Sequence, residues 1–587
     1  MEKTNEELQL RIRELEKEIA KLHTQIKKER YGLVWLDVPE GFERETENQI
    51  PVLEEVKDKA IKNDDGKPTH IIIEGDNYHA LTCLNYTHKG KIDVIYIDPP
   101  YNTGEDNFAY RDKRVLKEYP DGTPVPKDHP LRHSYWLSFM SKRLELAKNL
   151  LSDKGVIFIS IDDNEQANLK LLCDKIFGEE NFVGCAVWLK KRKGSFLSNK
   201  LVSLTEYVFI YAKTSSIQLY GGKPDNTESQ PIIKRTNTKK TLCFRANLVK
   251  TKLSNGIYRA GVYGESTTAS ELLNDIEIKD GVIVTDFKIH APFVWGQDFL
   301  EEEISKGTEF FINTKNLQVR VIRHNNDSIK ALPSFIDGRD CGATNEDAYE
   351  LLKEIFSMER PFEYSKPINL IQNLILSNSY FNKSSIILDF FAGSGTTLHA
   401  TMKLNAEDGG NRQCILVQQK EGDKNICESV TYERNKRVIN GYENAKGETV
   451  EGLGNSLKYY RTAFVGKNPP RRATDYDKAE LSKKAGCLLA LAENTLEEIE
   501  ASNSYQIFSD GKNHYTGVYF TGRLTEIETF TQKLEDIRNQ NRRIKITAYF
   551  FCWGDCAQFE DEFSNLERIS LQPIPKPILD IYQSINR

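Results

Sequence analysis

The chain has 587 residues, of which 39% are hydrophobic and 28% charged, and its net charge is −6. This length exceeds what one hydrophobic core organises, so several domains are expected, and no run of 18 apolar residues is available to cross a membrane. The charged N-terminus is unlike a signal peptide, and ten scattered cysteines predict reduced thiols in a cytoplasmic protein. Cys552 and Cys556 have no His partners, which favours packing over a zinc site, and we expect no metal.

The first thirty residues carry a heptad pattern. Apolar residues alternate at spacings of four and three, which is the seam of a coiled coil: Leu8, Ile12, Leu15, Ile19, Leu22 and Ile26. We expect a self-association or docking helix over 1–30; the alternative is an amphipathic helix that packs on the chain's own core. A mixed-charge connector at 31–70 ends in a turn cluster at 63–68.

Strand-like and helical patterns then alternate. Strands are expected at 71–74, 92–97 and 156–161, with a helix over Tyr135–Leu151 before the third. Two more strands are expected at 386–390 and 414–417. This alternation predicts an α/β fold with a parallel sheet and helices on both faces. The first core part is 71–188 and the second is 361–468, so an insert at 189–360 separates them.

The strand at 92–97 runs into Asp98-Pro99-Pro100-Tyr101. Two prolines end the strand ladder and stiffen the backbone, so a carboxylate and an aromatic ring lie at the carboxyl end of a central strand, where open α/β sheets bind ligands. Acceptors beside a stacking ring suit a planar base with an exocyclic amino group. The alternative for the tetrapeptide alone is a tight exit turn, with Tyr101 packed on a helix.

The insert begins with a basic block inside an acidic chain. Between Leu189 and Arg259 we count fifteen Lys or Arg and three acids, a net charge of +12. Such a block favours a polyanion partner over a solvated face. The candidate residues for binding this polyanion are Lys190, Lys191, Arg192, Lys193, Lys234, Arg235, Lys239 and Lys240.

The strand at 386–390 ends in a glycine turn, Asp389-Phe390-Phe391-Ala392-Gly393-Ser394-Gly395-Thr396-Thr397. Gly393 and Gly395 permit positive φ and close approach of a ligand. The turn lacks the third glycine of a dinucleotide fingerprint and the Lys-Ser/Thr of a phosphate loop, which counts against NAD and ATP. It still fits a nucleoside-bearing ligand. Beyond Pro469, residues 469–587 form a small α/β domain without a chemical motif.

The two motifs together resemble the S-adenosylmethionine (AdoMet)-dependent amino-methyltransferases of DNA, in the circularly permuted order of the β class, because Asp-Pro-Pro-Tyr precedes the glycine turn. Further segments resemble the modification (Mod) subunits of Type III restriction-modification systems: Tyr31–Trp35, Ile73–Asn77, Val94–Gly104, Gly155–Glu165 and Glu206–Lys213. The likeness covers roughly 1–215 and 361–465. It implies a Rossmann-like methyltransferase core with a target recognition domain at 189–360.

The resemblance also implies roles for individual residues. Asp98 and the Pro99 carbonyl would accept the N6 hydrogens of an adenine flipped out of the helix, and Tyr101 would stack on it. Lys366 would lie near the AdoMet carboxylate, unless it is an ordinary lysine at a helix start, and Asp76 near the AdoMet adenine. Gln418 replaces the acid with which many relatives bind the ribose. The remaining cofactor-site residues are Asp389, Phe391, Gly393, Gly395, Thr396 and Thr397.

The resemblance thus implies methylation of adenine N6 at specific sites in double-stranded DNA by a prokaryotic homodimer. A separate restriction (helicase/nuclease) subunit would be its partner, since the chain has no phosphate loop and no nuclease box. The alternatives are a stand-alone (orphan) adenine methyltransferase, a cytosine-N4 methyltransferase and a catalytically silent DNA-specificity subunit. Relatives that act on cytosine more often have Ser in place of Asp98, and the intact motifs argue against a silent site.

Overall fold

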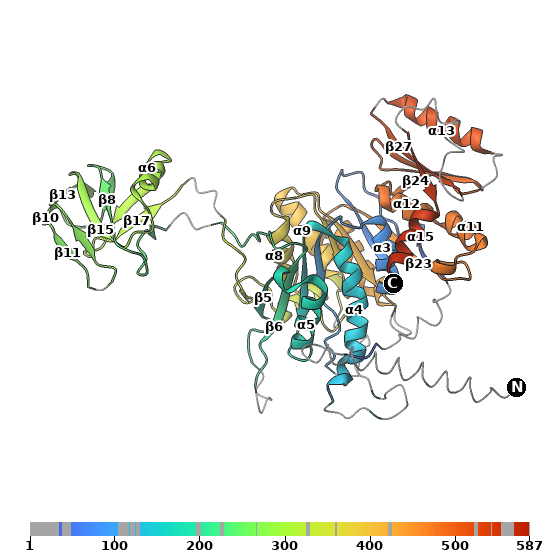
Figure 1. Cartoon of the computed structure of the whole chain (residues 1–587), viewed down its shortest axis with the longest axis horizontal. Coiled ribbons are helices and arrows are strands. Elements are labelled where there is room, and N and C mark those ends of the chain that lie inside the picture. Colours follow the sequence, from blue (N-terminus) through green and yellow to red (C-terminus); the bar gives the residue numbers. More distant parts are fainter. Residues whose placement is uncertain are drawn as a thin grey trace, which may run out of the picture. The chain divides into compact units, whose positions relative to one another are not determined.

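The computed structural model describes residues 35–37, 49–103, 117, 124, 129–194, 201–223, 228–265, 267–324, 329–358, 361–420, 425–521, 526–541, 543–552 and 569–585. Tyr220–Leu332 form one compact unit, and the described residues on either side form the other (Figure 1). The heptads expected at 1–30 lie outside the described residues. None of the helices within the described ranges is long and apolar enough to cross a membrane.

The larger unit is built on a ten-stranded mixed sheet in the order β1-β23-β2-β20-β19-β3-β4-β6-β5-β18. Its strands are β1 (Ile50–Glu55), β2 (Thr69–Glu74), β3 (Ile92–Ile97), β4 (Leu151–Ile161), β5 (Phe182–Leu189), β6 (Thr205–Ala212), β18 (Phe335–Asp337), β19 (Ile386–Asp389), β20 (Gln413–Gln418) and β23 (Ser456–Val465). The run from β23 to β4 is parallel. These central strands are apolar because helices bury both of their faces.

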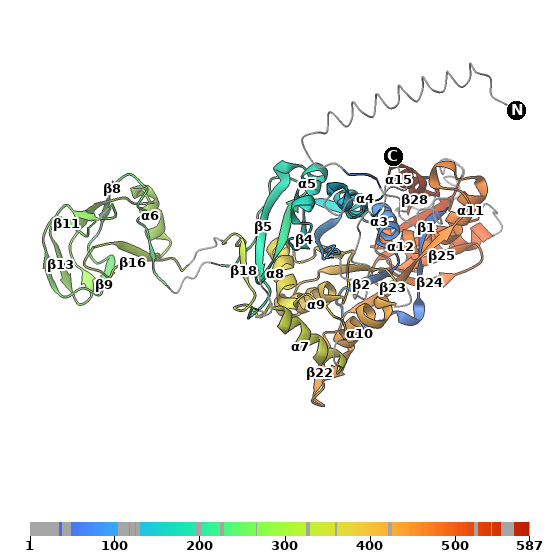
Figure 2. The same cartoon turned by 90° about the horizontal axis from the view of Figure 1, so that it is seen from below.

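Helices cover the two faces of this sheet in two groups, as Figure 2 shows. One group is α3 (Asn77–Thr87), α4 (Ser134–Leu150) and α5 (Gln166–Phe177). The other is α8 (Ile368–Ser379), α9 (Thr396–Asp408) and α10 (Glu433–Asn440), with a π-helical turn at Cys427–Tyr432 before α10 and α7 (Asn345–Phe356) beside it. The α/β sheet with helices on both faces, expected from the alternating patterns, is present.

The boundaries of the insert differ from the expected 189–360. The compact inserted unit is narrower, Tyr220–Leu332, because β6 pairs antiparallel with both β4 and β5, and β18 pairs with β5. These strands extend the large sheet on both sides of the insert. The connector expected at 31–70 is also more than a linker, since β1 within it pairs with β23.

The inserted unit has its own buried core between two sheets. One sheet has the order β10-β13-β14-β9-β16-β17-β7 and the other β11-β12-β15-β8. Its elements are β7 (Gln230–Pro231), β8 (Lys240–Phe244), β9 (Val249–Thr251), β10 (Gly256–Tyr258), β11 (Gly261–Tyr263), β12 (Ser270–Leu272), β13 (Ile276–Lys279), β14 (Val282–Ile283), β15 (Phe287–Ala291), α6 (Gln297–Ser305), β16 (Glu309–Ile312) and β17 (Val319–Ile322). Only β9 and β16 pair in parallel among these strands as described, so the βα alternation of the core is absent here.

The C-terminal part forms a five-stranded sheet in the order β24-β25-β26-β27-β28. Its elements are α11 (Asp475–Lys484), α12 (Gly486–Glu493), β24 (Glu497–Ala501), β25 (Tyr505–Ser509), β26 (His514–Tyr519), α13 (Ile527–Gln540), β27 (Lys545–Phe551), β28 (Ile569–Ile574) and α15 (Lys576–Ile585). α12 and α15 contact α3 of the large sheet. Tyr582 is fully buried and donates a hydrogen bond to the Pro51 carbonyl at 3.1 Å, so this part shares the core of the larger unit.

Candidate active site

Two motifs that are almost 300 residues apart in sequence meet at one edge of the ten-stranded sheet. β3 and β19 are neighbouring parallel strands, with Ile95 paired to Leu388. Their carboxyl ends therefore present Asp98–Tyr101 beside the turn Asp389–Gly395. This is the edge at which open α/β sheets bind their ligands.

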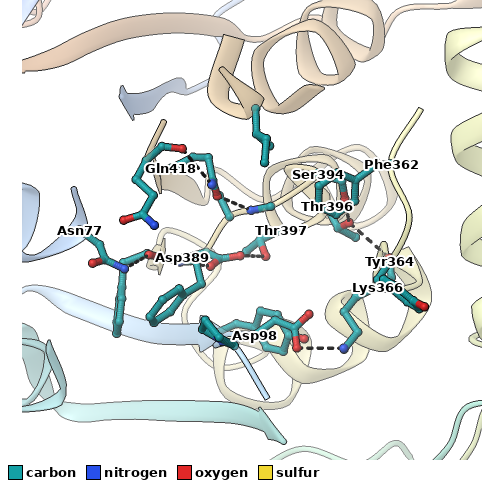
Figure 3. A pocket seen from close by; sticks show the side chains of 18 residues that line it. Asn77, Asp98, Phe362, Tyr364, Lys366, Asp389, Ser394, Thr396, Thr397 and Gln418 are labelled. Carbon is teal, nitrogen blue, oxygen red and sulfur yellow. Dashed lines mark hydrogen bonds and ion pairs between the residues drawn. The ribbon is translucent and has the colours of Figure 1, made fainter. Parts of the chain in front are cut away.

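Two adjoining cavities share a wall at this edge. Asp98, Phe362, Tyr364 and Lys366 line both of them. The first cavity continues along the glycine turn, where Figure 3 shows its side chains; it is also lined by Asn77, Asp389, Phe391, Gly393, Ser394, Thr396, Thr397 and Gln418. The second continues past Pro99, Tyr101, Lys190 and Glu206. A ligand in one cavity would thus meet a ligand in the other at Asp98.

The glycine turn requires its glycines. Gly393 has φ +50° and Gly395 has φ +74°, conformations that other residues adopt at a cost. A Cβ atom on Gly395 would also lie 3.1 Å from the Thr431 carbonyl oxygen and would collide with the Asn435 amide. Helix α9 begins directly after this turn at Thr396, so its free backbone N–H groups point toward the first cavity.

Asp98 belongs to a buried cluster of charged groups at the shared wall. The Lys366 ammonium lies 2.9 Å from Asp98 Oδ1 (dashed in Figure 3) and 3.3 Å from Glu206 Oε2. The Tyr101 hydroxyl donates to Asp98 at 2.7 Å and accepts from Lys366 at 2.9 Å. On its other side, Glu206 pairs with Lys190 at 2.8 Å. Two ammonium groups and two carboxyl groups therefore balance one another.

The pKa shifts in this cluster reflect burial and charge together. Burial raises the pKa of Asp98 above its ordinary value, although Lys366 opposes the shift. Burial disfavours the charge of Lys366, but Asp98 and Glu206 outweigh it and raise the pKa of Lys366. Burial also disfavours ionised Glu206, yet Lys366 and Lys190 hold the pKa of Glu206 below its ordinary value. Glu206 is therefore the firmly ionised carboxylate of the pair.

Asp389 and Gln418 both hold the glycine turn. Asp389 accepts hydrogen bonds from Thr397 Oγ1 at 2.6 Å and from the Phe391 N–H at 3.0 Å. Burial raises the pKa of Asp389 to about 7. The Gly393 N–H donates to Gln418 Oε1 at 2.7 Å, so Gln418 supports the backbone of the turn while it also lines the cavity.

The sequence of this site matches a known family over more than half of the chain. Residues 92–444 match the N6/N4 DNA methylase family. The chain belongs to this family. It is 32% identical to the Type III restriction-modification enzyme StyLTI Mod subunit of Salmonella typhimurium over 68% of this chain and 61% of that protein. It is 30% identical to the EcoP15I Mod subunit of Escherichia coli over 70% of this chain and 67% of that protein.

A third relative of the chain is the Type II methyltransferase M.KpnI of Klebsiella pneumoniae, with 32% identity over 59% of this chain and 79% of that protein. The chain spans about three fifths of the StyLTI Mod subunit.

The structure gives Asp76 a role in its own helix, whereas its expected place near the AdoMet adenine stays a prediction. Asp76 accepts a hydrogen bond from the Tyr78 N–H as the N-cap of α3 and pairs with Arg143 at 3.3 Å. It is not among the residues that line the first cavity. The next residue, Asn77, lines that cavity instead and donates to the Phe390 carbonyl at 3.0 Å. The N-cap position ties Asp76 to its own helix.

The two prolines of the Asp98–Tyr101 motif differ in their surroundings. The Pro100 carbonyl accepts a hydrogen bond from Trp136 Nε1 at 2.7 Å. Among the described residues, none donates a hydrogen bond to the Pro99 carbonyl. Pro99 therefore retains an open acceptor next to the Asp98 carboxyl group.

The predicted DNA-binding residues divide between the two units. Lys190–Lys193 follow β5 in the larger unit, whereas Lys234, Arg235, Lys239 and Lys240 are exposed in the inserted unit. Lys190 differs from the expectation, since its side chain is 14% exposed and pairs with Glu206. Arg192 pairs with Asp347 at 2.6 Å. The basic run around Lys190 is therefore partly structural.

Sequence reasoning did not assign a role to four residues that the site contains. Glu206 opens a segment that resembles the family, but no pattern indicated that its side chain shares Lys366 with Asp98. Phe362 and Tyr364 precede the Lys366-Pro367 pair and lie in both cavity walls. Arg434 lies behind the glycine turn. In the sequence, only its spacing from the turn could have indicated this position.

Proposed function

We propose that this chain transfers a methyl group from AdoMet to the N6 atom of adenine in double-stranded DNA. The observation that carries the proposal is the position of Asp98, which lies in the wall common to two cavities. One cavity has features that suit a nucleoside-bearing amino acid, and the other begins at the Asp98–Tyr101 motif. Membership of the DNA methylase family supports the same reaction.

The residues of the first cavity fit AdoMet. Phe362, Tyr364 and Phe391 supply aromatic surface for the adenosine part. The glycine turn allows close approach of the backbone, and the N-terminus of α9 favours a carboxylate. Bound there, AdoMet would supply an electrophilic methyl group on a sulfonium centre.

The residues of the second cavity fit a flipped adenine. The Asp98 carboxylate and the open Pro99 carbonyl would accept the two N6 hydrogens, which directs the N6 lone pair toward the methyl carbon. The N6 lone pair would form the new N–C bond as the S–CH₃ bond breaks with its electron pair left on sulfur, and the surplus N6 proton would pass to the adjoining Asp98 carboxylate. Without a bound base, the Lys366 ammonium pairs with Asp98 Oδ1. When the base binds to Asp98, Glu206 would remain as a partner for the Lys366 ammonium.

We further propose that the chain is the modification and specificity subunit of a Type III-like restriction-modification system. The Mod subunits among its relatives support this assignment. The exposed basic residues of Tyr220–Leu332 support DNA recognition by the inserted unit. A homodimer and a separate restriction subunit follow from the same proposal.

The reaction is tested with purified chain, unmethylated genomic DNA and AdoMet, followed by digestion to nucleosides and mass spectrometry. We expect N6-methyladenine. Asp98→Ala should abolish it while DNA binding is retained, and Asp64→Ala, which removes an exposed carboxylate, should leave it unchanged. N4-methylcytosine would overturn the base assignment, and normal methylation by Asp98→Ala would overturn the mechanism.

A further inference from the structure

Three arginines in the described part of the larger unit are fully buried, and one of them differs from the other two. Arg143 pairs with Asp76 at 3.3 Å, and Arg412 pairs with Asp408 at 2.9 Å. Arg434 is 1% exposed, and no described carboxylate lies within ion-pair distance of it. A buried charge without a counter-ion is costly, so such a group calls for a reason.

The hydrogen bonds of Arg434 lead toward the first cavity. Nη1 donates to Thr396 Oγ1 at 2.7 Å and to Ser394 Oγ at 3.0 Å. Nη2 lies 3.4 Å from Nδ1 of His399, a ring that burial and the Arg434 charge keep neutral by lowering its pKa. Nε has no hydrogen-bond partner among the described residues. The guanidinium is thus only partly satisfied by neutral groups.

A layer of three hydroxyl groups stands between Arg434 and the cavity. Ser365 Oγ lies 2.8 Å from Ser394 Oγ and 3.2 Å from Thr396 Oγ1, and the last two lie 3.1 Å apart. Ser394 and Thr396 line the cavity itself. Thr396 Oγ1 also donates to the Lys366 carbonyl at 3.3 Å. Because these oxygens accept from the guanidinium, a hydroxyl proton now donated within the layer or to this carbonyl can turn toward an anion in the cavity.

The N-terminus of α9 adds a second source of positive potential at the same place. This helix has 13 residues and begins at Thr396, one of the three hydroxyl residues. Its first backbone N–H groups carry the positive end of the helix dipole. The buried guanidinium and the helix end therefore act on one small region of the cavity wall.

Lys366, the residue expected near the AdoMet carboxylate, is committed elsewhere. Its ammonium contacts Asp98, Tyr101 and Glu206 at 2.9, 2.9 and 3.3 Å. The carboxyl groups of Asp98 and Glu206 already balance the charges of Lys366 and Lys190. The charge of Lys366 is thus directed to the wall shared with the second cavity.

We propose that Arg434, and not Lys366, supplies the positive charge that holds the carboxylate of AdoMet, acting through the hydroxyl groups of Ser394 and Thr396. Arg434 is then a positioning residue that selects an α-amino acid on the cofactor. The inference rests on the proposed function, because it assumes that AdoMet occupies the first cavity. The carboxylate would be the counter-ion that the buried guanidinium lacks.

The test compares two ligands by isothermal titration calorimetry: AdoMet and decarboxylated AdoMet, which differ only in the carboxylate. Four full-length variants are measured beside the wild type. Arg434→Met removes the charge, and Arg434→Lys restores it in another shape. Arg412→Met truncates an equally buried arginine that has its own carboxylate partner, and Lys366→Met removes the alternative charge.

We expect the wild type to bind AdoMet at least about 10-fold more tightly than the decarboxylated ligand, as for a charge-assisted contact. Arg434→Met should lose most of this preference by weakening AdoMet alone, whereas Arg434→Lys should regain part of it. Arg412→Met and Lys366→Met should retain it. If Arg434→Met does not fold, Arg434→Lys decides, because a displaced ammonium should reduce the preference without abolishing binding of the decarboxylated ligand.

Three results would count against the inference. A wild type that binds both ligands equally overturns it, as does full preference in Arg434→Met or, where that variant does not fold, in Arg434→Lys. Loss of preference in Lys366→Met assigns the charge to Lys366 and also overturns it. A wild type that binds neither ligand overturns the proposed function itself, which separates that failure from a failure of the role of Arg434.

Discussion

Glu206→Gln should destabilise the larger unit, because Glu206 joins two buried ammonium groups. Its carboxylate lies 2.8 Å from Lys190 Nζ and 3.3 Å from Lys366 Nζ, and the side chain is 8% exposed. At an effective dielectric constant of about 20, each contact is worth roughly 5–6 kcal/mol before desolvation. Removing one partner of a buried pair costs about 3–5 kcal/mol once the desolvation of the charges is counted. Glutamine keeps the shape of the side chain, so the loss reports the charge.

The assay is urea unfolding, monitored by tryptophan fluorescence, of the wild type, Glu206→Gln, Lys190→Met and the double variant. We expect the free energy of unfolding of the double variant to exceed the additive value by about 2 kcal/mol. Lys193→Met, which removes an exposed charge of the same basic run, should change it by less than about 0.5 kcal/mol. If the stability losses of the two single variants add up to the loss of the double variant, the reasoning is refuted. Lys190 would then again be a predicted DNA contact.

Three further predictions concern other parts of the chain. Burial lowers the pKa of His70 to about 4, so the unfolded state binds more protons than the folded state below pH 6.5 and the wild type loses stability as the pH falls. In urea unfolding, His70→Asn should remove about 2 kcal/mol of the stability that the wild type loses between pH 7 and pH 5. Combined alanine substitution of Lys234, Arg235, Lys239 and Lys240 should lower the salt dependence of DNA binding by a slope of up to about 3–4 in a filter-binding titration, with an unchanged melting temperature. Deletion of residues 1–30 should lower the molar mass in light scattering; an unchanged mass would move the predicted dimer interface elsewhere.

The sequence predicted the parts of the site that depend on the backbone of a strand. Residues 92–97 form β3 with the expected bounds, and 386–390 differ from β19 by one residue. Because the carboxyl ends of neighbouring parallel strands meet, Asp98 and the glycine turn could be placed together before any contact was known.

Contacts between side chains from distant segments could not be predicted in this way. Glu206 and Lys366 are 160 positions apart, and no local pattern shows that Lys366 joins Glu206 to Asp98. Asp76 caps α3 and pairs with Arg143, and its expected place near the AdoMet adenine stays a prediction. The insert begins later than 189 because β6 continues the large sheet, and the composition of a basic segment does not reveal such a strand.

The strand order has a consequence for co-translational folding of the chain. β2 and β3 are made early, yet β20 and β19, which are made about 290 residues after β3, lie between them in the sheet. At a synthesis rate of roughly 5–20 residues per second, the edges of β2 and β3 wait on the order of 15–60 s for their partners. During that interval an apolar strand edge is open to aggregation. We therefore expect the yield of soluble protein to depend on chaperones and on slow expression more than its final stability would suggest.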